Sequence, residues 1–288
     1  MLKRDGSLVF FTTLSQWSVG IIVCLTGLML LPGSEVVVTE SRISLTNPVF
    51  LALVLMLLAT TVSFLHLGNP VNALRTLNNL ATSWLSREIL GIGLFTLSLV
   101  VLFAYGFRSD QNEISLFVLV PASLAGLFLL WTMAYVYLLP TVPGWNSGHT
   151  PIGFAATALC LGLVTCLVSG MTGSIPIGKT ATTLCAALLV SVLFIEVVSA
   201  FLRQRQLAAM DTGFDGPRFD RGLLRKLFLV RLGTLLVAAS GIAFFVLIYE
   251  SAPGLISVPW LYPVLVLVVF QEIAGRMLFY GSYFRVGL

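Results

Sequence analysis

Residues Asn47 to Pro70 read NPVFLALVLMLLATTVSFLHLGNP. This segment contains no Asp, Glu, Lys or Arg, and it begins and ends on an Asn-Pro pair. An apolar run of this length matches the roughly 20 residues that an α-helix needs to cross the hydrocarbon core of a bilayer. Asn47, Asn69 and Thr150 each precede a proline as a capping residue precedes a proline in the first turn of a helix, so we expect helices to begin at these three pairs.

Further apolar runs of similar length occupy most of the remaining chain. Together with the first, they cover residues 8–31, 48–66, 88–107, 114–138, 151–170, 177–201, 227–249 and 259–284. The sequence therefore predicts an all-α, polytopic membrane bundle of about eight transmembrane helices, built as a single integral membrane domain over residues 1–288. The first run follows Lys3 and Arg4 as a secretion signal would, but without a small-residue cleavage pattern, so we expect it to be a retained crossing.

The composition supports the same class of protein. Hydrophobic residues make up 58% of the 288 residues and charged residues only 10%, whereas soluble domains carry about 25% charged residues. Water-soluble enzyme folds and disordered chains are therefore excluded. The net charge of +4 comes from basic residues that flank apolar runs, so it does not indicate nucleic acid as a partner. All four cysteines lie inside apolar runs: Cys24, Cys160, Cys166 and Cys185. We expect them to be small core residues that form no disulfides and bind no metal.

Basic residues are distributed unevenly about the predicted crossings. With an even number of crossings, both termini and the second, fourth and sixth connections share one end of the bundle. Eleven basic residues lie at that end and three at the other. The positive-inside rule makes the basic end cytoplasmic. Docking of a soluble partner subunit would also favour basic loops, so both explanations stand.

Residues 70–85, between the second and third runs, have a different pattern. Apolar side chains recur at three- and four-residue spacing and polar ones fill the other positions: Leu74, Leu77, Ala81 and Trp84 against Asn72, Arg75, Asn78, Asn79, Thr82 and Ser83. The segment is too short to cross, so it is predicted to be an amphipathic helix at the membrane interface with Trp84 as an aromatic anchor. It is either a connector or a lid over a site in the headgroup region. Ser86 is the expected cap of the next crossing.

Ionisable residues inside the apolar runs are few, and each costs at least about 2.5 kcal/mol at mid-bilayer, so each should be paired or functional. Glu272 and Arg276 are four residues apart in the order that favours an ion pair along one helix face. Glu196 and Arg231 lie at similar depth on consecutive antiparallel helices, so we expect them to meet. These pairs are either structural clasps or part of a proton path.

His66 ends the second run at the depth where hydrocarbon gives way to headgroups, and an imidazole exchanges protons near neutral pH. Gly68 leaves space beside it, and Pro70 begins the interfacial segment. Glu88 begins the third run at the same end of the bundle. Each residue could serve only its own helix end, or the two could form an acid/base pair for a lipid-soluble substrate. His149 is the only other histidine, which excludes a core with two bis-histidine haems.

Three groups of segments carry a resemblance to a known family. They are Phe64 to Pro70 with Asn78 and Ser86-Arg87-Glu88, then Thr141 to Trp145 with Thr150 to Phe154, and finally Glu272 to Arg276 with Phe279-Tyr280-Gly281. In this order, over nearly the whole chain, they resemble the membrane anchor subunit of bacterial dimethyl sulfoxide reductase.

The resemblance implies an integral subunit of the bacterial inner membrane that has no redox centre of its own. Such a subunit anchors an iron–sulfur electron-transfer subunit and a molybdopterin catalytic subunit, and it oxidises menaquinol. The molybdenum cofactor and [4Fe-4S] clusters are expected only in these partners, and no haem or metal is expected here. The resemblance gives His66 and Glu88 the catalytic role at the quinol site. We extend quinol binding to Gly68, Pro70, Arg75 and Asn78.

Two other classes of protein are compatible with the composition: a secondary transporter, or a scaffold without a quinol site. Transporters typically have repeated halves and broken helices, and the sequence has no repeated halves. A scaffold would not need His66 and Glu88 together. In the family's best-known arrangement the soluble subunits lie on the periplasmic face, whereas the charge bias puts the His66 end in the cytoplasm, so two orientations stay open.

Overall fold

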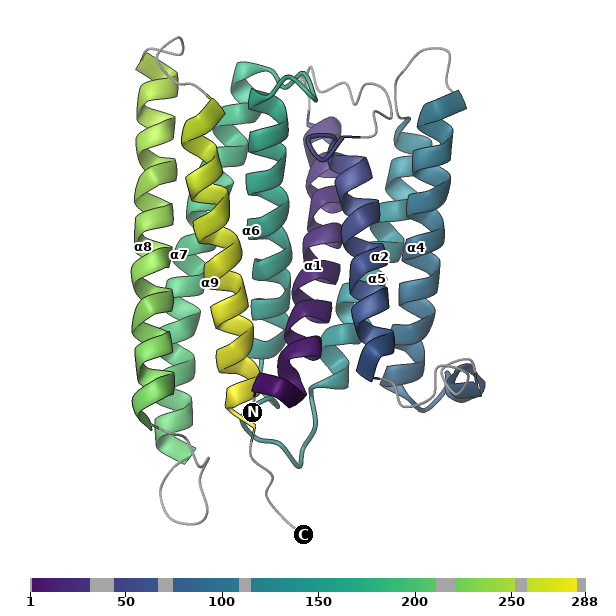
Figure 1. The fold of residues 1–288 in the computed structure, drawn as a ribbon, viewed down its shortest axis with the longest axis vertical. Helices are drawn as coiled ribbons and strands as arrows, with labels where there is room; N and C mark the ends of the chain where they lie inside the picture. The colour runs from purple at the N-terminus through teal and green to yellow at the C-terminus, as the bar shows by residue number, and fades with distance from the viewer. Residues whose placement is uncertain are drawn as a thin grey trace.

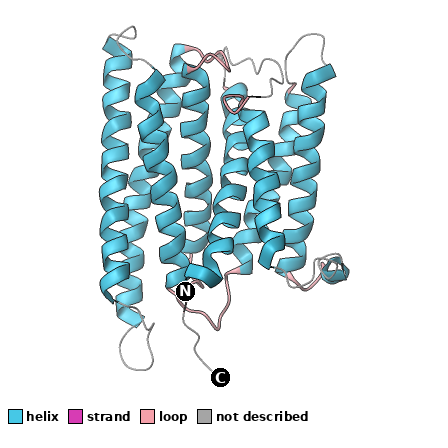
Figure 2. Ribbon diagram, in the orientation of Figure 1, coloured by secondary structure: helices cyan, strands magenta, loops and turns pink. Residues whose placement is uncertain are grey.

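The computed structural model describes residues 2–31, 44–66, 75–108, 115–210, 221–251 and 258–283. Within these ranges every regular element is a helix (Figures 1 and 2). The long helices are α1 (Leu2–Leu30), α2 (Pro48–His66), α4 (Trp84–Arg108), α5 (Leu116–Val136), α6 (His149–Met171), α7 (Lys179–Met210), α8 (Arg221–Ser251) and α9 (Leu261–Gly281). The predicted all-α bundle is confirmed, and each long helix overlaps one predicted crossing.

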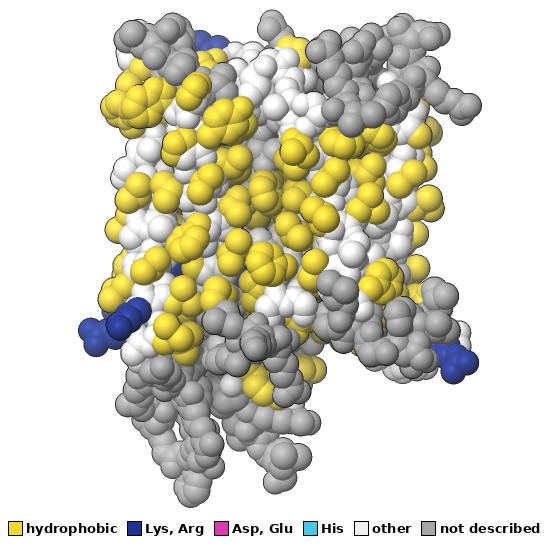
Figure 3. Space-filling model, viewed as in Figure 1, with side chains coloured by type: hydrophobic (Ala, Val, Ile, Leu, Met, Phe, Trp, Pro, Cys, Tyr) yellow, Lys and Arg dark blue, Asp and Glu magenta, His cyan; other side chains and the backbone are white. Residues whose placement is uncertain are grey.

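The outer surface of the bundle is apolar. Seven of the described helices are long and apolar enough to cross a membrane, and α2 contributes a shorter apolar stretch, Pro48–Phe64. Large hydrophobic side chains point outward, among them Phe117, Leu247 and Trp260, which are 85%, 69% and 67% exposed. Hydrophobic side chains cover the middle of the face drawn in Figure 3, and Lys or Arg side chains lie near its lower edge. Such a surface suits lipid, so the protein is a multi-pass membrane protein.

The described helix ends follow the predicted up-and-down order. α1 begins, and α2, α5, α7 and α9 end, at the lower end of the bundle in Figure 1. We call this the termini end and define it by Leu2 of α1, His66 of α2 and Gly281 of α9. α1 and α6 lie at the centre, where α1 contacts α2, α5, α6 and α9. The even number of crossings expected from the sequence therefore agrees with the fold.

The start of α2 agrees with the prediction from the sequence, whereas the start of α6 does not. The Asn47 Oδ1 accepts hydrogen bonds from two backbone N–H groups of the first turn of α2, at 3.0 and 3.2 Å, which confirms the predicted cap. α6 begins at His149, and the hydroxyl of the predicted cap Thr150 instead donates to the Trp145 carbonyl at 2.6 Å. The pair Asn69-Pro70 lies outside the described residues.

The prediction of one interfacial helix over residues 70–85 is wrong in its second half. Residues 70–74 lie outside the described part of the chain, and Arg75 to Asn79 is helical, ending in the 3-10 turn η1 (Leu77–Asn79). This piece lies beside the termini end, at the lower right of Figure 1. Residues 80–83 form a turn or have no regular structure, and Trp84 is the first residue of α4.

Arg87 supplies the physical reason for this break. Its guanidinium donates to the Leu80 carbonyl at 2.8 Å and to the Ala81 carbonyl at 2.7 Å, which closes the turn before α4. The Ser83 hydroxyl accepts a hydrogen bond from the Ser86 N–H at 3.3 Å. Ser83 is thus the capping residue, and the predicted cap Ser86 lies buried inside the helix.

Glycine lets the two central helices touch backbone to backbone. A Cβ atom added to Gly20 of α1 would lie 1.8 Å from the Ala158 carbonyl oxygen of α6. One added to Gly162 of α6 would lie 2.3 Å from the Gly20 carbonyl oxygen. Small residues at such contacts allow the close packing that holds membrane helices together.

Replacing Gly20 by alanine is expected to lower the free energy of unfolding by about 3 kcal/mol, the upper part of the range for overpacked cores. The added methyl group meets backbone and not a flexible side chain, so the helices must separate. Unfolding in mixed micelles measures the change. Gly27→Ala is the matched control on the same helix, because no atom lies within 4 Å of its added Cβ. Equal stability of both variants would contradict the prediction.

Candidate functional site

Of the residues predicted to bind quinol, His66 and Glu88 lie at the termini end of α2 and α4. His66 is the last residue of α2, while its side chain, Gly68 and Pro70 lie outside the described part of the structure. Glu88 lies one turn into α4, where its residue is only 5% exposed. The helical piece before α4 carries Arg75 and Asn78, whose side chains are exposed: the structure does not bring them into a hydrogen bond with Glu88.

The Glu88 side chain is buried, and its charge acts electrostatically on two phenols, those of Tyr137 and Tyr280. Among the described residues, no donor makes a hydrogen bond to it. Burial, the neighbouring Tyr280 and the Glu88 carboxylate raise the pKa of the Tyr137 phenol well above its usual range. The Tyr137 and Tyr280 hydroxyl oxygens are 2.7 Å apart, and the Tyr280 hydroxyl donates to Thr12 Oγ1 at 3.5 Å. A carboxylate to which no described residue donates suits acceptance of a hydrogen bond or a proton from a ligand.

Aromatic rings enclose these phenols. The Tyr137 ring centroid lies 5.4 Å from that of Trp145, 5.6 Å from that of Phe154 and 5.3 Å from that of Phe279. The Trp145 indole N–H donates to the Phe279 carbonyl at 2.8 Å, which fixes the loop before α6 against the end of α9. The fold thus brings together two segments that carried the family resemblance. Sequence reasoning gave these rings no role, although their clustering in those segments was the available signal.

Glu196 of α7 and Arg231 of α8 meet as predicted. The Arg231 Nη2 and Glu196 Oε2 atoms are 3.4 Å apart, with side chains 16% and 3% exposed. The Arg231 Nε also donates to Gln271 Oε1 at 3.4 Å. A Cβ atom at Gly275 of α9 would lie 2.8 Å from the Arg231 Cζ, so the glycine makes room for the guanidinium. The pair therefore joins three helices.

Glu272 and Arg276 do not form the direct pair that their spacing predicts. In the described part of the chain, Thr157 of α6 stands between them: its hydroxyl donates to Glu272 Oε2 at 2.7 Å and accepts from the Arg276 Nη2 at 2.9 Å. Arg276 also donates to Gln16 Oε1 of α1, and its guanidinium stacks 4.0 Å from the Phe154 ring centroid. Partners on neighbouring helices replace the expected contact along α9.

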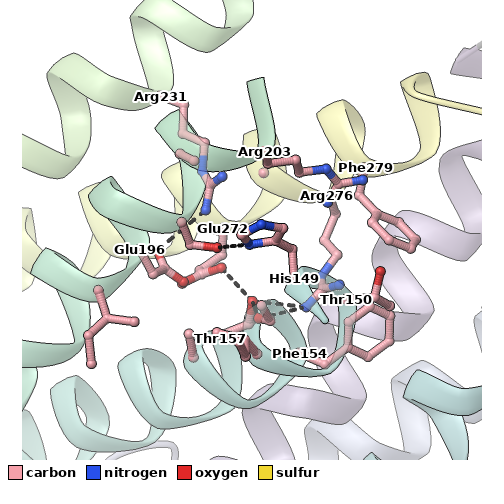
Figure 4. Close-up of a pocket in the computed structure, with 17 residues that line it drawn as sticks. His149, Thr150, Phe154, Thr157, Glu196, Arg203, Arg231, Glu272, Arg276 and Phe279 are labelled. Atoms are coloured by element: carbon pink, nitrogen blue, oxygen red, sulfur yellow. Dashed lines mark hydrogen bonds and ion pairs between the residues drawn. The ribbon is translucent and has the colours of Figure 1, made fainter. Parts of the chain in front are cut away.

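A cavity of about 50 Å³ lies among these groups, between α6, α7, α8 and α9 (Figure 4). Its charged and polar lining comprises His149, Thr150, Thr157, Glu196, Ser199, Arg203, Arg231, Glu272 and Arg276. The His149 Nδ1 lies 3.4 Å from the Ser199 hydroxyl oxygen. Sequence reasoning singled out the two acid–base pairs but did not place His149 or Arg203 with them.

One group of side chains has atoms close enough to bind a metal ion. The ligand atoms of Cys160, Glu196 and Glu272 lie within 4.8 Å of one another, and all three residues are buried. Arg231 and Thr157, however, already bind the two carboxylates. We therefore assign these residues to the hydrogen-bond network. Cys160 and the other cysteines are free and buried, which confirms the expectation of core cysteines.

Fold and site together define a polytopic helical membrane subunit with a buried polar site at one end of its bundle. The sequence model of the DMSO reductase anchor subunit (DmsC) family matches residues 3–282. The chain belongs to this family, and the resemblance drawn from its motifs is confirmed.

Curated relatives carry the same family name. The C subunit of anaerobic dimethyl sulfoxide reductase from Escherichia coli K12 is 28% identical over 301 aligned positions, which cover 99% of this chain and 97% of that protein. The corresponding C subunit from Haemophilus influenzae is 32% identical over 158 positions, covering 54% of this chain and 55% of that protein. The YnfH subunit of anaerobic dimethyl sulfoxide reductase from Escherichia coli K12 is 30% identical over 164 positions, covering 55% of each protein. The alignments with the last two relatives thus span about half their length.

Proposed function

We propose that this chain is the quinol-oxidising membrane anchor of a multisubunit reductase in the bacterial inner membrane. It holds an iron–sulfur subunit and a molybdopterin catalytic subunit at the membrane and passes electrons from menaquinol to the iron–sulfur subunit. The observation that carries this proposal is the buried Glu88 carboxylate, which has no hydrogen-bond donor among the described residues and acts electrostatically on the hydrogen-bonded phenols of Tyr137 and Tyr280. It lies at the same end of the bundle as His66.

Oxidation of a quinol to a quinone releases two protons and two electrons, so this protein must supply proton acceptors at the membrane boundary. His66 accepts the proton of one quinol hydroxyl. Glu88 accepts the second proton and releases it to water at the termini end. The electrons go to iron–sulfur clusters in the partner subunit, which supply the redox chemistry.

The neighbouring segments shape the entrance to this site. The proposed site extends to Gly68 and Pro70, which follow His66 closely in the sequence, and Arg75 and Asn78 present exposed polar side chains at the same end of the bundle. The partner subunit docks at the termini end, because electron transfer requires its cluster to lie close to the quinol. The basic residues of this end suit either such docking or a cytoplasmic orientation. Absence of haem from this protein stays a prediction.

Replacing His66 by alanine is expected to abolish quinol-dependent reduction of dimethyl sulfoxide, because the quinol loses its first proton acceptor. Turnover with a reduced quinol analogue in membrane vesicles measures the effect. The same preparation should stay active with an artificial donor that feeds the catalytic subunit directly, which shows that the complex is assembled. Normal quinol-dependent turnover in the variant would refute the role of His66.

A scaffold without a quinol site is the second candidate, because family membership by itself requires only anchoring. Fluorescence titration with a quinol analogue distinguishes the two functions. The proposal expects saturable binding at one site per molecule that His66→Ala removes. An inert anchor would show only partitioning into the lipid, without saturation.

A further inference from the structure

The cavity between α6, α7, α8 and α9 carries an excess of positive charge. Three guanidiniums line it, those of Arg203, Arg231 and Arg276, against the two carboxylates of Glu196 and Glu272 (Figure 4). With both acids ionised and His149 neutral, the described lining keeps one positive charge more than it has negative charges. An uncompensated charge in a low-dielectric interior is strongly unfavourable, so the balance calls for an anion.

Arg203 is the guanidinium without an acidic partner among the described residues. Its Nη2 donates to the Gly144 carbonyl at 3.3 Å and to the Ser282 hydroxyl at 2.9 Å, both neutral groups. The charged side chains that act on it are Arg231 and Arg276, which repel it. Its guanidinium also lies 4.8 Å from the Phe279 ring centroid.

The three guanidiniums keep donors unused. Arg276 is only 4% exposed, yet every hydrogen bond that it makes in the described part of the chain uses Nη2. The same nitrogen makes both bonds of Arg203, and Arg231 uses Nη2 and Nε. Within the described residues, Nη1 of all three therefore has no partner, although the side chains line the same small space. Guanidinium donors suit the oxygens of a phosphate, which they bind in bidentate fashion.

The cavity lies close to the outer surface of the bundle, between α6 and α7. Ile152 of α6 and Ile195 of α7 both line it, and both are about half exposed, at 50% and 49%. From His149, the first residue of α6, to Thr157 is roughly 12 Å at 1.5 Å per residue, so the cavity begins at the termini end and not at mid-membrane. Its volume of about 50 Å³ has room for a few water-sized atoms of roughly 10–15 Å³ each, which suits a phosphate group and not a fused quinone ring.

We propose that this cavity binds a singly charged phosphate group through Arg203, Arg231 and Arg276. Two sources have this chemistry: the phosphodiester of an anionic phospholipid, which would enter between α6 and α7, and free inorganic phosphate. The bound anion neutralises the excess charge and joins α7, α8 and α9. Phe154 and Phe279 contact arginines of this cavity and also Tyr137, so the two sites are neighbours, but the proposal does not depend on the quinol site.

The full-length protein, delipidated in a non-ionic maltoside detergent, tests the proposal. Phosphatidylglycerol, phosphatidylcholine and inorganic phosphate are added separately, and native mass spectrometry and the thermal unfolding midpoint report binding. We expect the wild type to retain one phosphatidylglycerol per molecule and to unfold at a higher midpoint. Arg203→Gln is expected to bind this lipid at least about tenfold more weakly, a loss of about 1.4 kcal/mol of binding free energy. Arg205→Gln is the matched control, because Arg205 lies two residues further along α7 and is exposed outside the cavity.

Each outcome decides the proposal. If inorganic phosphate raises the midpoint of the wild type but not of Arg203→Gln, the site is supported and the source is the free ion. If Arg203→Gln does not fold, Arg203→Lys replaces it, and we expect a smaller but measurable loss because an ammonium cannot bind phosphate in bidentate fashion. Failure of the wild type to retain either anion would overturn the proposal, as would equal losses in the Arg203 and Arg205 variants.

Discussion

Replacing Glu88 by glutamine is expected to lower quinol-dependent turnover by about 10²–10⁴-fold, the usual contribution of a positioned acid/base group. The amide keeps the shape and burial of the side chain but cannot take up the proton that the quinol releases. Because no protein donor in the described residues binds the carboxylate, its replacement removes no structural contact of that kind. Steady-state turnover with a reduced quinol analogue in membrane vesicles measures the loss.

Glu250→Gln provides the matched control for this substitution. Glu250 lies on α8, and its carboxylate pairs with Lys179 at 3.4 Å with both side chains about half exposed. We expect turnover at the wild-type level in this variant. If Glu88→Gln lost activity equally with the artificial donor, the defect would be in assembly, and a proton-transfer role for Glu88 would not be supported.

Replacing Arg231 by leucine is expected to lower the free energy of unfolding by about 3–5 kcal/mol, the effect of breaking a buried ion pair from one side. Glu196 would then be an unpaired carboxyl group, 3% exposed and close to Glu272. Unfolding in mixed micelles measures the loss. The double variant Glu196→Gln with Arg231→Leu should recover part of the stability, because it removes both charges of the ion pair.

The pair on the outer surface supplies the comparison. Lys179 and Glu250 are 52% and 49% exposed, and removing Lys179 as Lys179→Leu should cost no more than about 1 kcal/mol, as exposed pairs do. A loss from Arg231→Leu as small as the loss from Lys179→Leu would show that the buried pair is not a structural clasp.

The sequence predicted the crossings well because the signals for them are local. Hydropathy depends only on the residues within each run, and the Asn47 cap depends only on the first turn of α2. Prediction failed where a longer contact decided the boundary. Arg87 reaches back to the carbonyls of Leu80 and Ala81, so the interfacial helix ends before Trp84, which no periodicity could indicate.

The candidate site was also predicted correctly only in part. Membrane depth alone sufficed to predict that Glu196 meets Arg231, because consecutive antiparallel helices place residues of equal depth side by side. The spacing of Glu272 and Arg276 predicted a pair that the fold does not make, because Thr157 offers a closer partner from α6. Which helix faces turn toward each other depends on packing between distant segments, and spacing along the sequence does not contain that information.

The sequence alone determined that this protein is a helical membrane bundle with few charges inside it. It also determined that His66 and Glu88 lie at one end of the bundle. The sequence suffices for this because the free energy of placing each residue in hydrocarbon depends mainly on its own side chain. Only the tertiary structure decided that Tyr137 and Tyr280 form a hydrogen-bonded pair on which Glu88 acts electrostatically, and that three arginines share one cavity. These contacts arise from the rotation of each helix about its axis, which is fixed by close packing such as that of Gly20 against α6.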